Sequence, residues 1–180
     1  AYGSMRQDPT GAGKDASGWV TTLFEDTPIL PPYLIAVVIG AYHTQEASTK
    51  RRGITVRVHI PASDPLTHAM FTLDLLHQAV DFFEDYFSYD LPAKKLDIVA
   101  LKHFSSLGME NWGLMSFAHA YCVVSPQTPF EVRRRICRLV GHEVAHQWFG
   151  NLVSLKSWRY IWLKEGLARY LEYVFVTHHF

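Results

Sequence analysis

The sequence is poor in cysteine, has no net charge and lacks a long apolar run. Cys122 and Cys137 are its only cysteines, too few for a disulfide framework and not spaced like a zinc knuckle. Lysine plus arginine and aspartate plus glutamate each total 17, so the formal net charge is zero at pH 7. Two short basic runs, 50–52 and 133–135, are typical of solvated faces. We therefore expect no nucleic-acid binding.

The longest apolar run, residues 33–42, is about half the length that a bilayer-spanning helix needs. The chain does not open with a basic segment, an apolar stretch and a small-residue cleavage site, and it has no Asn-x-Ser/Thr sequon. Its balance of 48% apolar and 19% charged residues is that of a globular protein. We expect a cytoplasmic protein, and nothing in this segment indicates membrane attachment.

The first third of the chain has the pattern of β-structure, and the remainder mixes strands with helices. Strands are predicted where alternating or β-branched apolar residues lie between turn residues, at 19–24, 33–42, 54–60, 96–101 and, as one or two strands, 114–124. Helices are predicted where apolar residues recur at helical spacing, at about 65–87, 128–150 and 162–176. The predicted fold class is α+β.

Capping residues mark the ends of two predicted helices. Asp64 is a suitable N-cap ahead of Pro65, because proline fits the first helical position. The segment from Thr128 to Glu131 has the form of a capping box. Gly150 is a suitable C-terminal cap for the helix that Thr128 would start.

His142-Glu143-Val-Ala-His146 lies within this second predicted helix. Residues four apart project from one helix face, so both imidazoles can bind one ion, and a catalytic zinc takes three protein ligands and leaves one position open. Glu143 lies beside the pair, where it can take a proton from a zinc-activated water. After eighteen intervening residues, Glu165 is the predicted third ligand. Glu172, two turns further, is predicted to hydrogen-bond a ligand histidine and fix its tautomer.

The sequence around these residues resembles the M1 family of zinc aminopeptidases. Three stretches carry the resemblance: Gly141-His-Glu-Val-Ala-His-Gln-Trp-Phe-Gly-Asn-Leu-Val153, Trp162-Leu-Lys-Glu-Gly166 and Gly108-Met-Glu-Asn-Trp-Gly113. The resemblance implies a thermolysin-like zinc metallopeptidase domain, incomplete in this chain, across residues 53–180. Residues 1–52, through Thr27-Pro28 and 33–38, resemble the closing strands of the family's N-terminal β domain.

The family's exopeptidase motif is Gly-Ala-Met-Glu-Asn, and residues 107–111 read Leu-Gly-Met-Glu-Asn. By resemblance, Glu110 binds the free α-ammonium of a peptide, and the neighbouring Gly108, Met109 and Asn111 bind its backbone as an added strand. A carboxylate one residue's length from zinc favours a positive N-terminus and leaves no room for a longer chain. We therefore predict peptide substrates with a free N-terminus.

The sequence also departs from the family's pattern. Lys164 stands where asparagine is common, and Phe117-Ala118-His119 stands where many members have Tyr-Arg-Glu. The family's transition-state tyrosine and helical domain would lie beyond Phe180. We therefore expect this chain to be the middle part of a longer enzyme.

These observations predict a zinc aminopeptidase that holds one zinc ion and hydrolyses the N-terminal peptide bond, with Glu143 as general base. Two alternatives stay open. A zinc endopeptidase would use the same metal centre on internal bonds and would still cleave an N-acetylated peptide. A catalytically silent binding protein that keeps the zinc fold would fail a simple aminoacyl-arylamide assay.

Overall fold

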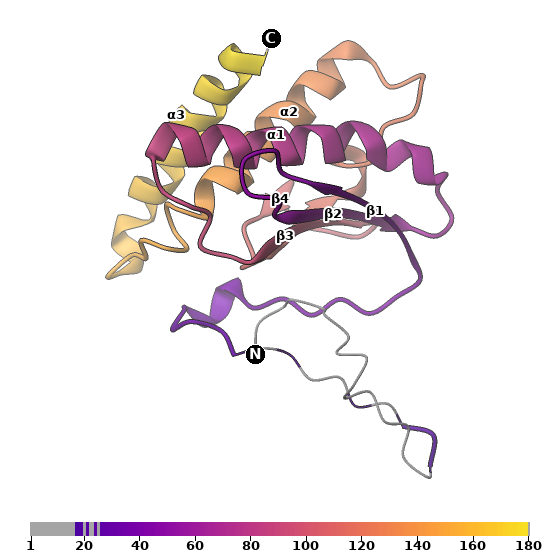
Figure 1. The fold of residues 1–180 in the computed structure, drawn as a ribbon, viewed down its shortest axis with the longest axis horizontal. Helices are drawn as coiled ribbons and strands as arrows, with labels where there is room; N and C mark the ends of the chain where they lie inside the picture. The colour runs from indigo at the N-terminus through magenta and orange to yellow at the C-terminus, as the bar shows by residue number, and fades with distance from the viewer. Residues whose placement is uncertain (1–16, 20, 22–23, 25, 180) are drawn as a thin grey trace.

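The computed structural model describes residues 17–19, 21, 24 and 26–179. Within this part, one sheet packs with three α-helices, and the predicted α+β class is confirmed (Figure 1). The strands are β1 (Tyr42–Ser48), β2 (Thr55–Pro61), β3 (Lys95–Leu101), β4 (Gly108–Met109) and β5 (Leu114–Ala118). The α-helices are α1 (Met70–Phe87), α2 (Phe130–His146) and α3 (Ile161–His179). Four short 3-10 turns accompany them: η1 (Pro32–Leu34), η2 (Leu66–Ala69), η3 (His119–Tyr121) and η4 (Trp158–Tyr160).

The sheet has the strand order β1-β2-β3-β5-β4, with parallel pairs at its centre and antiparallel pairs at both edges. The central strand β3 is buried on both faces, which is typical of strands in the parallel part of a sheet. Leu96 and Ile98 are fully buried in the apolar core. Lys95 Nζ donates to Asp97 Oδ2 at 2.8 Å and to the Gly113 carbonyl at 2.9 Å, so the buried charges are paired.

Helix α1 lies across β1 and β2 (Figure 1). In β2 the apolar residues Val56, Val58 and Ile60 are fully buried, and the residues between them are half-buried. Leu76 of α1 belongs to the same apolar core. The alternation that predicted a strand here thus reflects one face packed on the core, and both elements are confirmed.

Neither predicted N-cap makes a capping hydrogen bond. A proline occupies the N-cap position ahead of η2 and of α2, at Pro65 and Pro129, so the residue before it lies too far out to reach the helix N–H groups. Asp64 instead lies 3.0 Å from His119 Nε2. The Thr128 hydroxyl accepts a hydrogen bond from a backbone N–H three residues earlier, at 2.9 Å.

Residues 33–42 do not form the predicted strand. After η1 the chain makes no strand pairing until β1 begins at Tyr42. Val37 and Ile39 are 80% and 92% exposed. Their pattern is that of a strand, but a strand needs a hydrogen-bonded neighbour, and the described residues place none beside this segment. Half of the strand predicted at 19–24, residues 20, 22 and 23, falls outside the described residues, and residues 19, 21 and 24 belong to no strand.

The later elements start near their predicted positions but two of them end early. Of residues 114–124, only the first five form a strand, and η3 follows. Helix α2 ends at His146, and Gly150 has a positive φ of 121° in the turn beyond it, so this glycine does not cap the helix directly. Helix α3 is confirmed and extends the predicted range to residues 161–179.

Aromatic side chains from α1, α3 and the turn after α2 meet in one cluster. The Phe83 ring lies 6.1 Å from that of Trp148 and 6.0 Å from that of Phe175. At Gly141 of α2, a Cβ atom would lie 2.8 Å from Phe175 Cδ1 and 3.4 Å from the Glu172 Cα. Helices α2 and α3 therefore approach each other as closely as a glycine allows, which brings α3 beside the histidine face of α2.

The predicted division of the chain at residue 52 stays a prediction. Strand β1 lies before that residue and pairs along its whole length with β2, which lies after it. In the described part of the chain, no helix has both the length and the apolar character needed to cross a membrane.

Candidate metal centre

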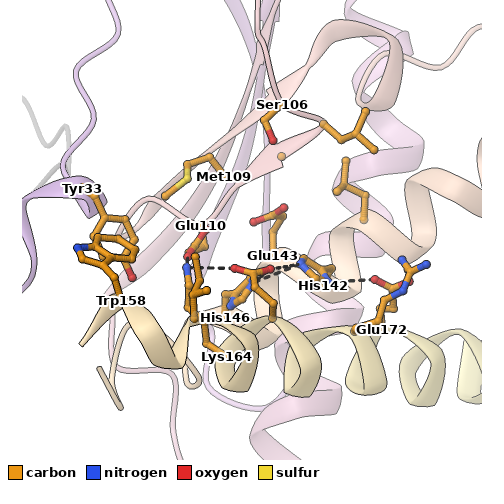
Figure 2. A pocket seen from close by; sticks show the side chains of 16 residues that line it. Tyr33, Ser106, Met109, Glu110, His142, Glu143, His146, Trp158, Lys164 and Glu172 are labelled. Atoms are coloured by element: carbon orange, nitrogen blue, oxygen red, sulfur yellow. Dashed lines mark hydrogen bonds and ion pairs between the residues drawn. The ribbon is translucent and has the colours of Figure 1, made fainter. Parts of the chain in front are cut away.

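Three side chains from α2 and α3 meet in the arrangement of a metal site (Figure 2). The Nε2 atoms of His142 and His146 lie 3.1 Å apart, and each lies 3.5 Å from Glu165 Oε2. Ligand atoms about 2.0–2.1 Å from a tetrahedral zinc ion lie about 3.3 Å from one another. The donor set of two imidazoles and one carboxylate therefore fits a zinc ion in both its chemistry and its spacing.

The other ring nitrogen of each histidine has a hydrogen-bond acceptor. His142 Nδ1 lies 3.0 Å from Glu172 Oε2, and His146 Nδ1 lies 2.8 Å from the Phe149 carbonyl oxygen. A proton on each Nδ1 satisfies both acceptors and leaves the Nε2 lone pairs directed at one point. The structure thus places Glu172 in its predicted position, beside Nδ1 of a candidate ligand histidine.

Two arginines hold the Glu172 carboxylate in addition to His142. Arg138 Nη2 and Arg169 Nη1 lie 2.8 Å and 2.7 Å from Glu172 Oε1. Burial raises the pKa of Glu172, but the hydrogen bonds from His142 and Arg138 outweigh it, so its pKa is lowered. Glu172 is thus held as an anion, the form that best accepts the His142 Nδ1 proton.

Glu143 lies beside the two histidines and is 4% exposed. Burial raises the pKa of its carboxyl group to about 8, although the nearby His142 lowers it. Its Oε2 atom is buried and has no hydrogen-bond partner. A Cβ atom at Gly108 would overlap the carboxylate, so the glycine of β4 makes room for it. A buried carboxyl group with one unpartnered oxygen and a raised pKa is suited to exchange a proton with a molecule in the site.

Glu110 lies on the opposite side of the metal-ligand cluster from Glu172 (Figure 2). It forms an ion pair with Lys164, and both residues are buried, each with 4% of its surface exposed. Lys164 Nζ also lies 3.2 Å from Glu165 Oε1 and 5.0 Å from the centre of the Tyr33 ring. The sequence identified Lys164 only as a departure from the family's pattern, and a contact with a residue 54 positions away has no local signal.

The backbone at Glu110 is fixed by the turn that follows α2. Asn151 Nδ2 and Gln147 Nε2 donate to the Glu110 carbonyl oxygen at 2.9 Å and 3.3 Å. Both residues are part of the extended histidine motif, but the sequence alone assigned them no role. They tie the exopeptidase-like segment to the helix that carries the histidines.

A cavity of about 480 Å³ connects these groups. Gly108, Met109 and Glu110 line it, together with the three candidate metal ligands and Glu143. Asn111 does not line it, and its Oδ1 accepts a hydrogen bond from the Ser116 hydroxyl at 3.0 Å. The structure therefore brings all the predicted site residues except Asn111 to one cavity, and the predicted substrate contact of Asn111 stays a prediction.

Comparison with known proteins gives the class of this site. The model of the peptidase family M1 domain matches residues 71–180, which include the histidines and all three buried glutamates of the cavity. The chain belongs to peptidase family M1, and the resemblance found in the sequence is confirmed.

Curated relatives match nearly the whole chain. It is 39% identical over 154 residues to aminopeptidase N of Lactococcus lactis subsp. lactis, covering 86% of this chain and 18% of the relative. It is 36% identical over 167 residues to aminopeptidase N of Haemonchus contortus, covering 91% of this chain and 17% of that relative. It is 36% identical over 174 residues to puromycin-sensitive aminopeptidase of Caenorhabditis elegans, covering 96% of this chain and 18% of that relative. The chain spans less than a fifth of the length of these relatives.

Proposed function

We propose that the protein carrying this chain is a zinc aminopeptidase with a thermolysin-like catalytic domain that hydrolyses the first peptide bond of peptides. The observation that carries the proposal is the triangle of ligand atoms from His142, His146 and Glu165, with spacings of 3.1–3.5 Å. The names of the curated relatives and the matching family support the same activity.

In this proposal, His142, His146 and Glu165 hold one zinc ion. Zinc, when bound, polarises the scissile carbonyl and lowers the pKa of water. Glu143 accepts the proton of the attacking water and delivers it to the leaving amine, acting first as base and then as acid. Bound zinc would lower the pKa of Glu143, which is about 8 without metal, and so would favour the carboxylate form that accepts the proton. Glu172 keeps the His142 ring in its ligand orientation through the Nδ1 hydrogen bond.

The exopeptidase assignment is supported by Glu110 and by the edge of the sheet. Strand β4 ends the strand order, so its outer edge can pair with an extended peptide. Glu110 follows β4 directly and lies to one side of the metal-ligand cluster (Figure 2). A peptide on β4 would therefore bring its first residue to Glu110. The contact between Glu110 and the first residue of the peptide depends on Lys164, because Lys164 already forms an ion pair with the Glu110 carboxylate.

The test uses the full protein that carries this chain, loaded with zinc, and matched peptides with a free and an acetylated N-terminus. Mass spectrometry of the products identifies the bond that is cleaved. Release of the first residue from either peptide supports the proposal. Cleavage only at internal bonds supports an endopeptidase, and no cleavage by a zinc-loaded protein supports a silent binding protein. Either of these two results overturns the proposal.

A further inference from the structure

Glu110 is paired with a positive charge that belongs to the chain itself. The Lys164 ammonium contacts the Glu110 carboxylate, lies 3.2 Å from Glu165 Oε1 and faces the Tyr33 ring at 5.0 Å. Lys164 has therefore two carboxylates and an aromatic face as partners, which are the partners that an ammonium group prefers. It needs no substrate to satisfy its charge.

The position of Lys164 in α3 makes this contact a built feature of the helix. The buried residues of α3 form one stripe at helical spacing: Lys164, Ala168, Leu171, Glu172 and Phe175. Lys164 is the first member of that stripe and is 4% exposed. A lysine is seldom buried to this degree unless it is paired, and Glu110 supplies the pairing charge.

An incoming α-ammonium would meet this ion pair rather than a free carboxylate. The Glu110–Lys164 pair has no net charge, so it offers little attraction to a second cation, and Lys164 repels one placed within reach of Glu110. Moving Lys164 aside would break a buried ion pair and leave a buried charge without its partner, which is costly. An acyl group brings a carbonyl acceptor instead of a cation, and the Lys164 ammonium attracts it.

We propose that Lys164 takes the place of the substrate's α-ammonium on Glu110, so that this subsite selects peptides whose first residue is acylated at its nitrogen and uncharged there. The proposal rests on the proposed function, because it concerns the first residue of a peptide substrate. Tyr33 and Trp158, whose ring centres lie 4.9 Å apart, line the same cavity and offer an apolar surface to a neutral acyl cap.

The experiment measures binding instead of turnover. Isothermal titration calorimetry compares two peptides of one sequence, one with a free and one with an acetylated N-terminus, on the zinc-loaded Glu143→Gln variant of the full protein. We expect the acetylated peptide to bind at least about tenfold more tightly. With Lys164→Asn added, Glu110 is unpaired and the preference reverses in favour of the free amine. Lys164→Arg, which keeps the charge, retains the preference for the acetylated peptide.

Lys156→Gln is the matched control, because Lys156 is exposed and does not line the cavity. It should leave both affinities unchanged. Tighter binding of the free-amine peptide to the Glu143→Gln protein overturns the proposal, and so does the absence of binding by either peptide. This measurement needs no change at position 164, so it decides the matter even if the Lys164 variants fail to fold. Failure of the proposed function appears separately, as zinc-loaded wild-type protein that releases the first residue of neither peptide.

Discussion

Glu110 and Glu172 are both buried carboxylates beside the candidate metal ligands, but their counter-charges lie in different places. At Glu172, Arg138 and Arg169 bind one carboxylate oxygen, and the second oxygen accepts from His142. At Glu110, the counter-charge comes from Lys164, which itself lines the cavity. Two buried glutamates therefore have different surroundings. The Glu172 carboxylate orients a candidate metal ligand, and the Glu110 carboxylate forms with Lys164 an ion pair of zero net charge at one end of the cavity.

The first prediction concerns Glu143, which lies between these two carboxylates. Replacing Glu143 by Gln should lower kcat by about 100- to 10,000-fold, because the amide cannot accept the proton of the attacking water. Zinc content should stay at the wild-type level, since Glu143 is not one of the three grouped ligands. Steady-state kinetics and metal analysis of the purified full protein measure the two quantities.

Glu131→Gln is the control for this change, because Glu131 lies on the same helix, forms an ion pair with Arg134 and is largely exposed. It should leave kcat unchanged. Turnover of Glu143→Gln at the wild-type rate would remove Glu143 from the proposed mechanism and leave the chemistry without a base in this chain.

The second prediction is the pH dependence of zinc binding. Burial lowers the pKa of metal-free His142, but its hydrogen bonds with Glu165 and Glu172 outweigh this, and its pKa is raised to about 9. Zinc binds the neutral imidazole, so a proton must leave His142 whenever zinc binds below pH 9. Zinc affinity should therefore fall by about tenfold for each pH unit below that value. Competition with a chelator of known proton affinity measures the zinc affinity at each pH. A zinc affinity that stays constant between about pH 6.5 and about pH 8.5 contradicts the prediction.

The third prediction tests the Glu172 half of the comparison. Removing the acceptor with Glu172→Leu should weaken zinc binding by up to about 100-fold, and Glu172→Gln, which keeps a carbonyl acceptor, by about tenfold. The same substitutions lower the pKa of His142 and should flatten the pH dependence of zinc affinity. Circular dichroism checks that both variants fold. Equal zinc affinity in wild type and the Leu variant would mean that Glu172 only balances the two arginines.

Sequence patterns predicted which side chains share a helix face and which residues form the candidate metal site, but they did not predict the Glu110–Lys164 contact. The spacing of His142 and His146 fixed their common face, and the spacing of Glu165 and Glu172 placed both on nearly the same face of α3, the first as a predicted metal ligand and the second as the predicted acceptor of a histidine N–H. The Glu110–Lys164 pair depends on how α3 packs against the segment after β4, which no local pattern encodes. The failed strand at 33–42 has the same cause, because its run of apolar, partly β-branched residues is present but no described strand pairs with it.

The smallest predicted effect concerns the close approach of α2 and α3, on which both halves of the comparison depend. Gly141→Ala places a methyl group 2.8 Å from Phe175 Cδ1, and that ring is buried in the aromatic cluster and cannot easily move aside. The overlap should lower the free energy of unfolding by about 1–3 kcal/mol and weaken zinc binding through a small displacement of α3. Gly166→Ala is the matched control, because nothing lies within 4 Å of its added methyl group. It should stabilise α3 by about 0.5–1 kcal/mol, since alanine favours the helix over glycine. Thermal unfolding of the two variants measures both effects, and equal stabilisation by both would mean that the close approach of α2 and α3 does not require a glycine at position 141.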